Sequence, residues 1–165
     1  MPVGGLVFTT ATLPQPGELI NNEWLLVNGY RLLRMEAHKF SFETLDLYQK
    51  CRALVAEVYR VQKLFPNEER YALGDQVRRA ATSVTANLAE GSGRQSIKEK
   101  IHFVEISYGS LMEVFCELQT ATDLGYITET KLNELRPLFT DIAKMLSGLR
   151  KSLSSRLEPH GLNNQ

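Results

Sequence analysis

The sequence lacks long apolar runs, an excess of charge of either sign, and a basic N-terminus. No apolar stretch approaches the roughly 18 residues needed to cross a bilayer, so we expect no membrane span. Nineteen basic and nineteen acidic side chains cancel, so any attraction to nucleic acid must come from a local patch. The first basic residue is Arg31, too late for a secretory signal, and we expect a cytoplasmic protein.

Patterns of redox and phosphate chemistry are also missing. The sequence contains two cysteines, Cys51 and Cys116, which form no CxxC pattern. Both lie on expected apolar stripes, so we interpret them as buried thiols. The glycine-rich turn at residues 91–94 lacks the pattern of a phosphate loop. It precedes an expected helix, where an anion would be favoured, but we favour the interpretation of a plain helix break.

Carboxylates and histidine on helices raise the possibility of a di-iron site. That chemistry requires Glu-x-x-His on two helices, with single glutamates on two others. The nearest match is His102 with Glu105, in reversed order. Both lie off the apolar stripe of their helix, as do Glu113 and Glu117, so we expect a solvated acidic face. No nucleophile lies near a base either, and the sequence predicts no enzyme, no metal ion and no cofactor.

From residue 41 onward, apolar residues recur at alternating spacings of three and four, as on one face of a helix. Helices are predicted over residues 41–65, 73–93, 96–124 and 128–153. Four such helices with short connections can bury their stripes only against one another. The sequence therefore predicts an all-α fold, an antiparallel up-down four-helix bundle over residues 41–157. The stripe positions are Leu47, Cys51, Leu54, Val58, Val61, Phe65, Leu73, Val77, Ala81, Val84, Leu88, Ile97, Ile101, Val104, Tyr108, Leu111, Phe115, Leu118, Thr122, Leu132, Leu135, Phe139, Ile142, Leu146, Leu149 and Leu153.

Helix boundaries are indicated by capping residues. Ser41 is expected to cap the first helix, and Ser96 with Glu99 has the spacing of a capping box before the third. Gly125 suits the residue after the third helix. Pro137 falls inside the fourth stripe, which continues in phase, so we expect a kink without an end to the helix.

The segments outside the bundle show no helical period. Residues 1–40 are rich in proline and glycine and are predicted to be an irregular N-terminal extension or docking arm. Residues 24–27 and 30–33 are apolar enough to form a short helix or strand. Met35 is an alternative start, which would make the preceding residues dispensable; a docking arm explains them equally. Residues 158–165 are expected to be a flexible tail.

The second helix is unusually rich in small residues, which would let another helix approach closely. Asn87 borders its apolar stripe, where a polar residue often fixes register. Glu90 and Arg94 bracket the following turn and are expected to pair or to bond exposed backbone. The small residues are Ala80, Ala81, Thr82, Ser83, Thr85, Ala86 and Ala89.

Basic residues gather at two places, around the turn between the second and third helices and along the outer arc of the fourth. Spacing alone leaves open whether they bind a partner or only keep the helices soluble. Several apolar residues off the main stripes, such as Leu45, Tyr59, Ile106 and Leu138, indicate a contact with further copies of the chain. The candidate nucleic-acid-binding residues are Arg78, Arg79, Arg94, Lys98, Lys100, Arg136, Lys144, Arg150 and Lys151.

Several stretches together resemble one protein family over roughly residues 40–153. That family is the four-helix bundle proteins encoded in intervening sequences of bacterial large-subunit rRNA genes. Those proteins are similar to the accessory variability proteins of diversity-generating retroelements. The matching stretches are Phe42-Glu43-Thr44-Leu45 with Tyr48, Val58-Tyr59, Phe65-Pro66-Asn67-Glu68-Glu69-Arg70-Tyr71-Ala72-Leu73, Gln76-Val77-Arg78-Arg79-Ala80-Ala81, Ser83-Val84-Thr85-Ala86-Asn87-Leu88-Ala89-Glu90-Gly91-Ser92-Gly93-Arg94, Gly109-Ser110-Leu111-Met112-Glu113 and Leu124-Gly125-Tyr126-Ile127.

The resemblance implies a cyclic homo-oligomer, typically a pentamer, without catalytic residues. In the retroelement relatives it implies a basic surface that engages RNA or DNA and a reverse transcriptase. The present chain is near neutral where those relatives are more basic. Two functions therefore stay open: a nucleic-acid-associated accessory scaffold that serves a reverse transcriptase, or a homo-oligomeric protein-interaction module without nucleic-acid binding.

Overall fold

The computed structural model describes residues 26–27, 30–31 and 39–157. The chain divides into two compact units, Met1–His38 and Lys39–Gln165. In the first unit, β1 (Leu26–Val27) pairs antiparallel with β2 (Tyr30–Arg31). Most of the expected N-terminal arm, and the expected tail at residues 158–165, lie outside the described residues.

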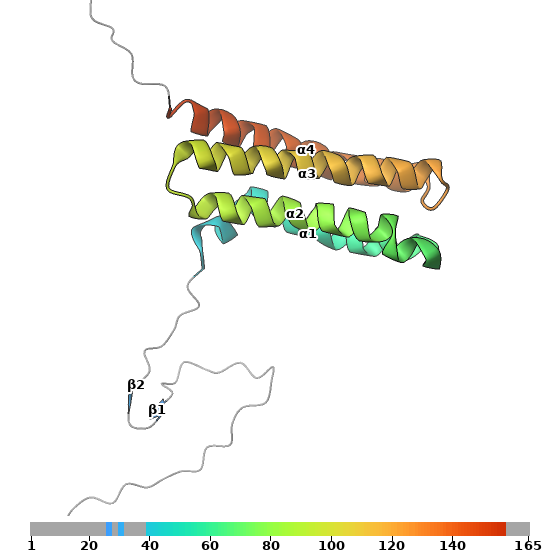
Figure 1. The fold of residues 1–165 in the computed structure, drawn as a ribbon, viewed down its shortest axis with the longest axis horizontal. Helices are drawn as coiled ribbons and strands as arrows, with labels where there is room; N and C mark the ends of the chain where they lie inside the picture. Colours follow the sequence, from blue (N-terminus) through green and yellow to red (C-terminus); the bar gives the residue numbers. More distant parts are fainter. Residues whose placement is uncertain (1–25, 28–29, 32–38, 158–165) are drawn as a thin grey trace, which may run out of the picture. The chain divides into compact units, whose positions relative to one another are not determined.

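The second unit is a four-helix bundle (Figure 1). Figure 1 shows the turn between α2 and α3 at one end of the bundle and the turn between α3 and α4 at the other. α2 and α3 share the most extensive contact of any helix pair. No helix within residues 39–157 is long and apolar enough to cross a membrane. The elements of this unit are η1 (Ser41–Thr44), α1 (Asp46–Val61), η2 (Gln62–Leu64), η3 (Asn67–Tyr71), α2 (Leu73–Gly93), α3 (Ile97–Asp123) and α4 (Glu129–Ser154).

The core consists of the apolar stripes that the sequence predicts for α1, α2 and α4. Most stripe positions of these helices are buried, while Leu73 and Leu149 are half-buried. Ala80 and Gly91 are also buried on α2. The spacings of three and four predict the buried positions of these helices correctly, because each helix presents one continuous apolar face to its neighbours.

The predicted stripe of α3 is partly wrong. Tyr108 is exposed, whereas Ser107 and Ser110 are buried and were not expected to be. The reason is the neighbour: α3 turns one flank toward the small side chains of α2, so small residues fill that contact. Thr122 and Phe115 of the predicted stripe are half-buried. The buried positions of α3 are Val104, Ser107, Ser110, Leu111, Val114, Leu118 and Ala121.

The close contact between α2 and α3 depends on a glycine. A Cβ atom added at Gly91 would lie 2.8 Å from Cβ of Phe103, closer than real Cβ contacts allow. Of the small residues named in the prediction, Ser83 also contacts α3, with its Oγ 2.8 Å from Ser110 Oγ, so α3 is a helix that approaches α2 closely. At Gly93, two residues later, a Cβ would meet nothing within 4 Å.

The helix ends differ in part from those expected. Ser41 does not cap α1; it begins a 3-10 turn, and Glu43 Oε1 accepts from the Phe40 amide at 3.0 Å. Ser96 does precede α3, but its side chain makes no capping bond. Ser96 and Glu99 are both exposed, where such bonds compete with water.

The other two predicted boundary features are present. Gly125 has a φ of 75° and follows α3, with its amide donating to Thr122 O at 2.9 Å. Thr128 then caps α4, since its Oγ1 accepts from the Lys131 amide at 3.2 Å. Pro137 lies inside α4, which continues to Ser154 as expected.

Candidate nucleic-acid interface

Every arginine among the nine candidate cations forms an ion pair within the bundle. Arg78 and Arg79 share Asp75, at 3.2 and 3.4 Å. Arg94 pairs with Glu90, which confirms the expected pair across the turn after α2. The remaining two pairs are Arg136 with Glu129 at 4.0 Å and Arg150 with Glu105 at 3.2 Å. These partners offset the arginine charges locally.

Three of these arginines also have a structural role. Arg78 is half-buried and donates to Gln62 Oε1 at 2.9 Å and to the carbonyl of Arg70 at 3.1 Å, which ties η2 and η3 to α2. Arg94 lies over the ring of Phe103, 4.8 Å from its centroid. Arg136 lies 5.0 Å from the centroid of the Phe115 ring.

The four candidate lysines differ from the arginines. Lys98, Lys144 and Lys151 are exposed, and Lys100 is half-buried. None of the four forms an ion pair with another residue in the part of the chain that the structure describes. Lys98, Lys144 and Lys151 therefore present their charges to solvent without an ion-pair partner among the described residues.

Lys144 and Lys151 lie two turns apart on the same side of α4, about 10 Å from one another along the axis. The carboxylates of α4 form their ion pairs with other cations, although the charge of Lys144 also acts on Asp141 and lowers its pKa. Glu134 pairs with Lys131 at 2.9 Å, and Asp141 pairs with Lys50 of α1 at 2.7 Å. The hydrogen bond from Lys50 lowers the pKa of Asp141, which keeps that pair charged. The third carboxylate of α4, Glu129, is the ion-pair partner of Arg136. The outer face of α4 is thus left positive by its two lysines.

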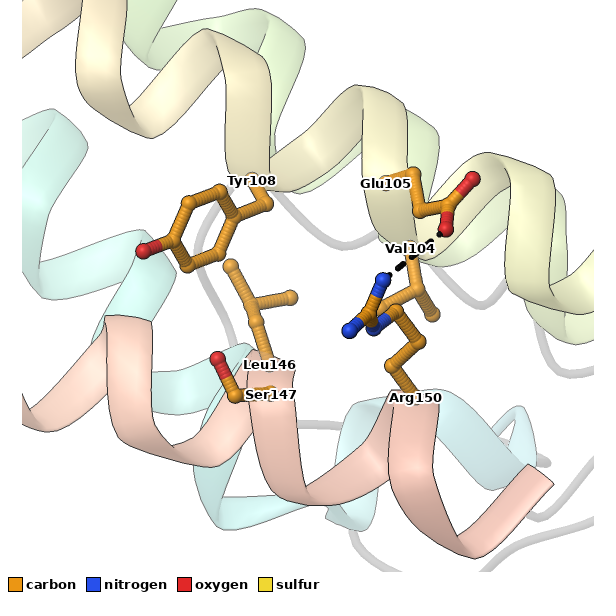
Figure 2. Close-up of a pocket in the computed structure, with 6 residues that line it drawn as sticks. All are labelled: Val104, Glu105, Tyr108, Leu146, Ser147 and Arg150. Carbon is orange, nitrogen blue, oxygen red and sulfur yellow. Dashed lines mark hydrogen bonds and ion pairs between the residues drawn. The ribbon is translucent and has the colours of Figure 1, made fainter. Parts of the chain in front are cut away.

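A cleft lies beside this face, between α3 and α4 (Figure 2). It has a volume of about 300 Å³ and is lined by Val104, Glu105, Tyr108, Leu146, Ser147 and Arg150. Figure 2 shows the Tyr108 ring on one side of Leu146 and the Arg150–Glu105 ion pair on the other. The cleft therefore offers an aromatic ring, an apolar floor and a charged rim.

Sequence reasoning missed this combination. It expected Tyr108 in the core, yet Tyr108 is 37% exposed and lines a cleft with Ser147 and Arg150. The contact depends on how α3 and α4 are aligned along each other. No spacing within either helix encodes that alignment.

The family of the chain follows from a sequence match over residues 43–148, which span most of the four helices. The matching family is described as the 23S rRNA-intervening sequence protein. The chain belongs to this family. Its structure also resembles the crystal structure of a protein with unknown function from the S23 ribosomal protein family of Bacteroides thetaiotaomicron. That likeness has a TM-score of 0.59 and 24% identity, over 64% of this chain and 98% of the other, and it supports the fold alone. No match was found among curated proteins.

In this 23S rRNA-intervening sequence family member, a partly buried polar network joins α2 to α3 inside the matched segment. Asn87 Nδ2 donates to the carbonyl and to Oγ of Ser83, at 2.8 and 2.9 Å. Ser83 Oγ lies 2.8 Å from Ser110 Oγ, and Ser107 Oγ donates to Val84 O at 2.8 Å. Asn87 is therefore part of a set of bonds that fixes the alignment of the two helices.

The acidic face expected on α3 is not fully solvated. Glu117 is half-buried, and its Oε2 has no hydrogen-bond partner among the described residues. Burial, and then the charge of Glu113, raise the pKa of Glu117 to about 7, against the opposing charge of Arg79. The expectation for Glu117 was wrong because this side chain lies on the flank of α3 that turns toward α2. Within the described ranges, no three His, Cys, Asp or Glu side chains gather closely enough to hold a metal ion.

The expectation of two buried cysteines is correct for one of them. Cys51 is buried in the core, and burial raises the pKa of its thiol to about 12. Cys116 is exposed. The error for Cys116 has the same origin as that for Tyr108, because the buried face of α3 is rotated from the predicted stripe.

Proposed function

We propose that the chain is a non-catalytic subunit of a cyclic homo-oligomer, a pentamer, that holds RNA or DNA as an accessory scaffold for a reverse transcriptase. The four helices run antiparallel in this proposal, and the assembly works in the cytoplasm. The observation that carries it is the pair Lys144 and Lys151, exposed on one side of α4 beside the α3–α4 cleft.

Phosphate contact is the chemistry that this surface supports best. The described carboxylates of α4 are already engaged by Lys50, Lys131 and Arg136, so the local field at the two lysines stays positive although the whole chain is neutral. Lysine serves as a phosphate-binding point charge. The contacts would be independent of base sequence, because phosphates carry no sequence information.

Oligomerisation is supported by apolar side chains that one bundle leaves exposed. Leu45, Tyr59 and Ile106 are each more than a third exposed, as is Met112. Leu138 was expected to need the same cover, but it is partly buried against the core of its own bundle. A closed ring would cover part of this surface and repeat the lysine pair once per subunit. Individually weak phosphate contacts would then add through multivalency. The reverse transcriptase as partner rests on the resemblance to retroelement accessory proteins.

The test is binding of the full chain to structured RNA and to duplex DNA at low salt. We expect the double variant K144Q/K151Q to bind both more weakly than the native chain. The matched control is K50Q/K131Q, which removes the same charge from lysines that are already ion-paired, and which should bind nearly as the native chain does. Equal weakening by both double variants would show that only total charge matters.

The exposed apolar residues also favour a second function, a protein-interaction module without nucleic-acid binding. The zero net charge of the chain fits that function as well. It becomes the better account if neither nucleic acid binds the native chain at low salt while light scattering shows an oligomer.

A further inference from the structure

A second cleft lies at the other end of the bundle, where η2, η3 and the start of α2 meet. It has a volume of about 380 Å³ and is lined by Gln62, Lys63, Arg70, Tyr71 and Arg78. Only Arg78 is among the candidate nucleic-acid-binding residues. The other four come from the connection between α1 and α2, which lies outside both basic clusters.

The charge of this cleft is positive. Three of its lining residues are cations, and none is a carboxylate. Lys63 and Arg70 are exposed and form no ion pair within residues 39–157. Arg78 is held in place by Asp75, at 3.2 Å, and by the Arg70 carbonyl. The cleft therefore has one fixed cation and two exposed ones.

Tyr71 supplies an aromatic surface beside these charges. It is 90% exposed, so its ring contributes almost nothing to the core and both faces remain accessible. A single exposed aromatic residue is ordinary on a protein surface. Here its neighbours matter, because an aromatic ring among cations is the combination that binds unpaired nucleotides by stacking and phosphate contact.

Gln62 positions one cation of the cleft. Its side chain is only 6% exposed and lines the cleft. Oε1 accepts from Arg78 Nη1 at 2.9 Å, which orients the amide so that Nε2 is the remaining donor. Nε2 lies toward Gly74 of α2, where an added Cβ would come within 2.9 Å of it. The amide is therefore held between Arg78 and α2, and it keeps the Arg78 guanidinium in place at the wall of the cleft.

We infer that this cleft binds an unpaired nucleotide of a single-stranded RNA or DNA. The base stacks on Tyr71, and the flanking phosphates contact Lys63 and Arg70 beside the fixed guanidinium of Arg78. This inference rests on the proposed nucleic-acid function. It adds a contact that distinguishes single strands from duplexes, which the lysine pair on α4 does not. An acidic peptide would use the cations but would leave the ring without a role.

The test is fluorescence anisotropy of a labelled 12-nucleotide single strand and of the blunt duplex of the same sequence, with the full chain. Stacking on an aromatic residue contributes enough per base that Y71A should weaken single-strand binding about 5- to 150-fold. Duplex binding should change less than about twofold, since stacked bases cannot reach the ring. Y71F keeps the ring and should bind like the native chain. The matched control is L124A, which removes an exposed apolar side chain after α3 that belongs neither to this cleft nor to the proposed contact between subunits.

The phosphate contacts have their own signature. Loss of two contacts in K63Q/R70Q should flatten the single-strand salt slope by about 1.4 log units per decade. Tyr71 is exposed, so Y71A leaves the core intact, and equal melting temperatures would verify this.

Three results would overturn the inference. The first is that the native chain and the Y71A variant bind single strands equally well. If K144Q/K151Q still weakens binding in that case, the proposed function stands without this cleft. The second is a free nucleoside monophosphate that competes as strongly as the strand, which would assign the cleft to free nucleotides. The third is an acidic 12-residue peptide whose binding depends equally on Tyr71.

Discussion

The hydroxyl of Ser83 on α2 lies 2.8 Å from the hydroxyl of Ser110 on α3, at the tightest helix contact of the bundle. Asn87 reaches the same Ser83 hydroxyl from the next turn of α2. The two serines therefore couple the helices through one bond. They do so where two small side chains also allow the backbones to approach.

This coupling is measurable with a double-mutant cycle of S83A and S110A. A single hydrogen bond contributes about 0.5–1.5 kcal/mol to the free energy of unfolding, and the coupling between the two changes should fall in that range. Urea denaturation of the native chain and the three variants supplies the numbers. A coupling near zero would mean that the serines are merely small.

Gly91 and Gly93 provide a matched pair for the close approach of α2 and α3. G91A places a methyl group 2.8 Å from Cβ of Phe103 and should destabilise the fold by about 1–3 kcal/mol. G93A meets nothing within 4 Å and should be neutral or stabilising by up to about 1 kcal/mol. Thermal and urea melts of both variants compare them directly. Equal effects would contradict the packing described for α2.

The two glycines also show how far the sequence alone could go. The composition of α2 predicted a close helix contact, but the residue that meets Gly91 depends on alignment with α3. The stripes of α1 and α4 were predictable because each helix presents one continuous apolar face. The stripe of α3 was not, because its flank faces small residues, where Ser107 replaces a larger apolar side chain.

The same distinction holds for the candidate interface. The exposed arc of α4 followed from spacing within one helix, and Lys144 and Lys151 are exposed as expected. Spacing within one helix could not predict which cations form ion pairs, because partners such as Glu105 of α3 belong to other helices. The position of Tyr108 beside Arg150 is likewise a product of packing.

Glu117 should make stability depend on pH. Its pKa is raised from 4.5 to about 7 in the folded chain, so the folded state binds its proton more tightly than the unfolded state. Stability is then highest below the unfolded pKa and falls as pH rises between roughly 4.5 and 7. E117Q should remove this fall, which is about 1 kcal/mol after allowance for solvent screening.

The measurement is the free energy of unfolding of both proteins at pH 5 and pH 8 in urea. E117Q should gain relative to the native chain only at the higher pH. The exposed Glu99 provides a control with the same change in charge, and E99Q should track the native chain at both values. If the difference in free energy of unfolding between the native chain and E117Q is the same at pH 5 and at pH 8, Glu117 does not cause the pH dependence.

The bundle should be stable without the first 34 residues. Every buried side chain in the described core belongs to residues 47–153. A chain that starts at Met35 should therefore lose less than about 2 kcal/mol, the contribution of one large buried side chain. Melting of the full and shortened chains tests this. A larger loss would make the N-terminal segment part of the core.

The central claim is that the lysine pair of α4 contacts phosphates, and the salt dependence of binding tests it most directly. Each neutralised phosphate contributes about 0.7 to 0.9 log units of affinity per decade of salt. The slope for the native chain on structured RNA should therefore be steeper than that for K144Q/K151Q, by about 1.4 to 1.8 for each subunit in contact. K50Q/K131Q should keep the native slope. An unchanged slope in K144Q/K151Q, or no binding by the native chain at low salt, would contradict the account.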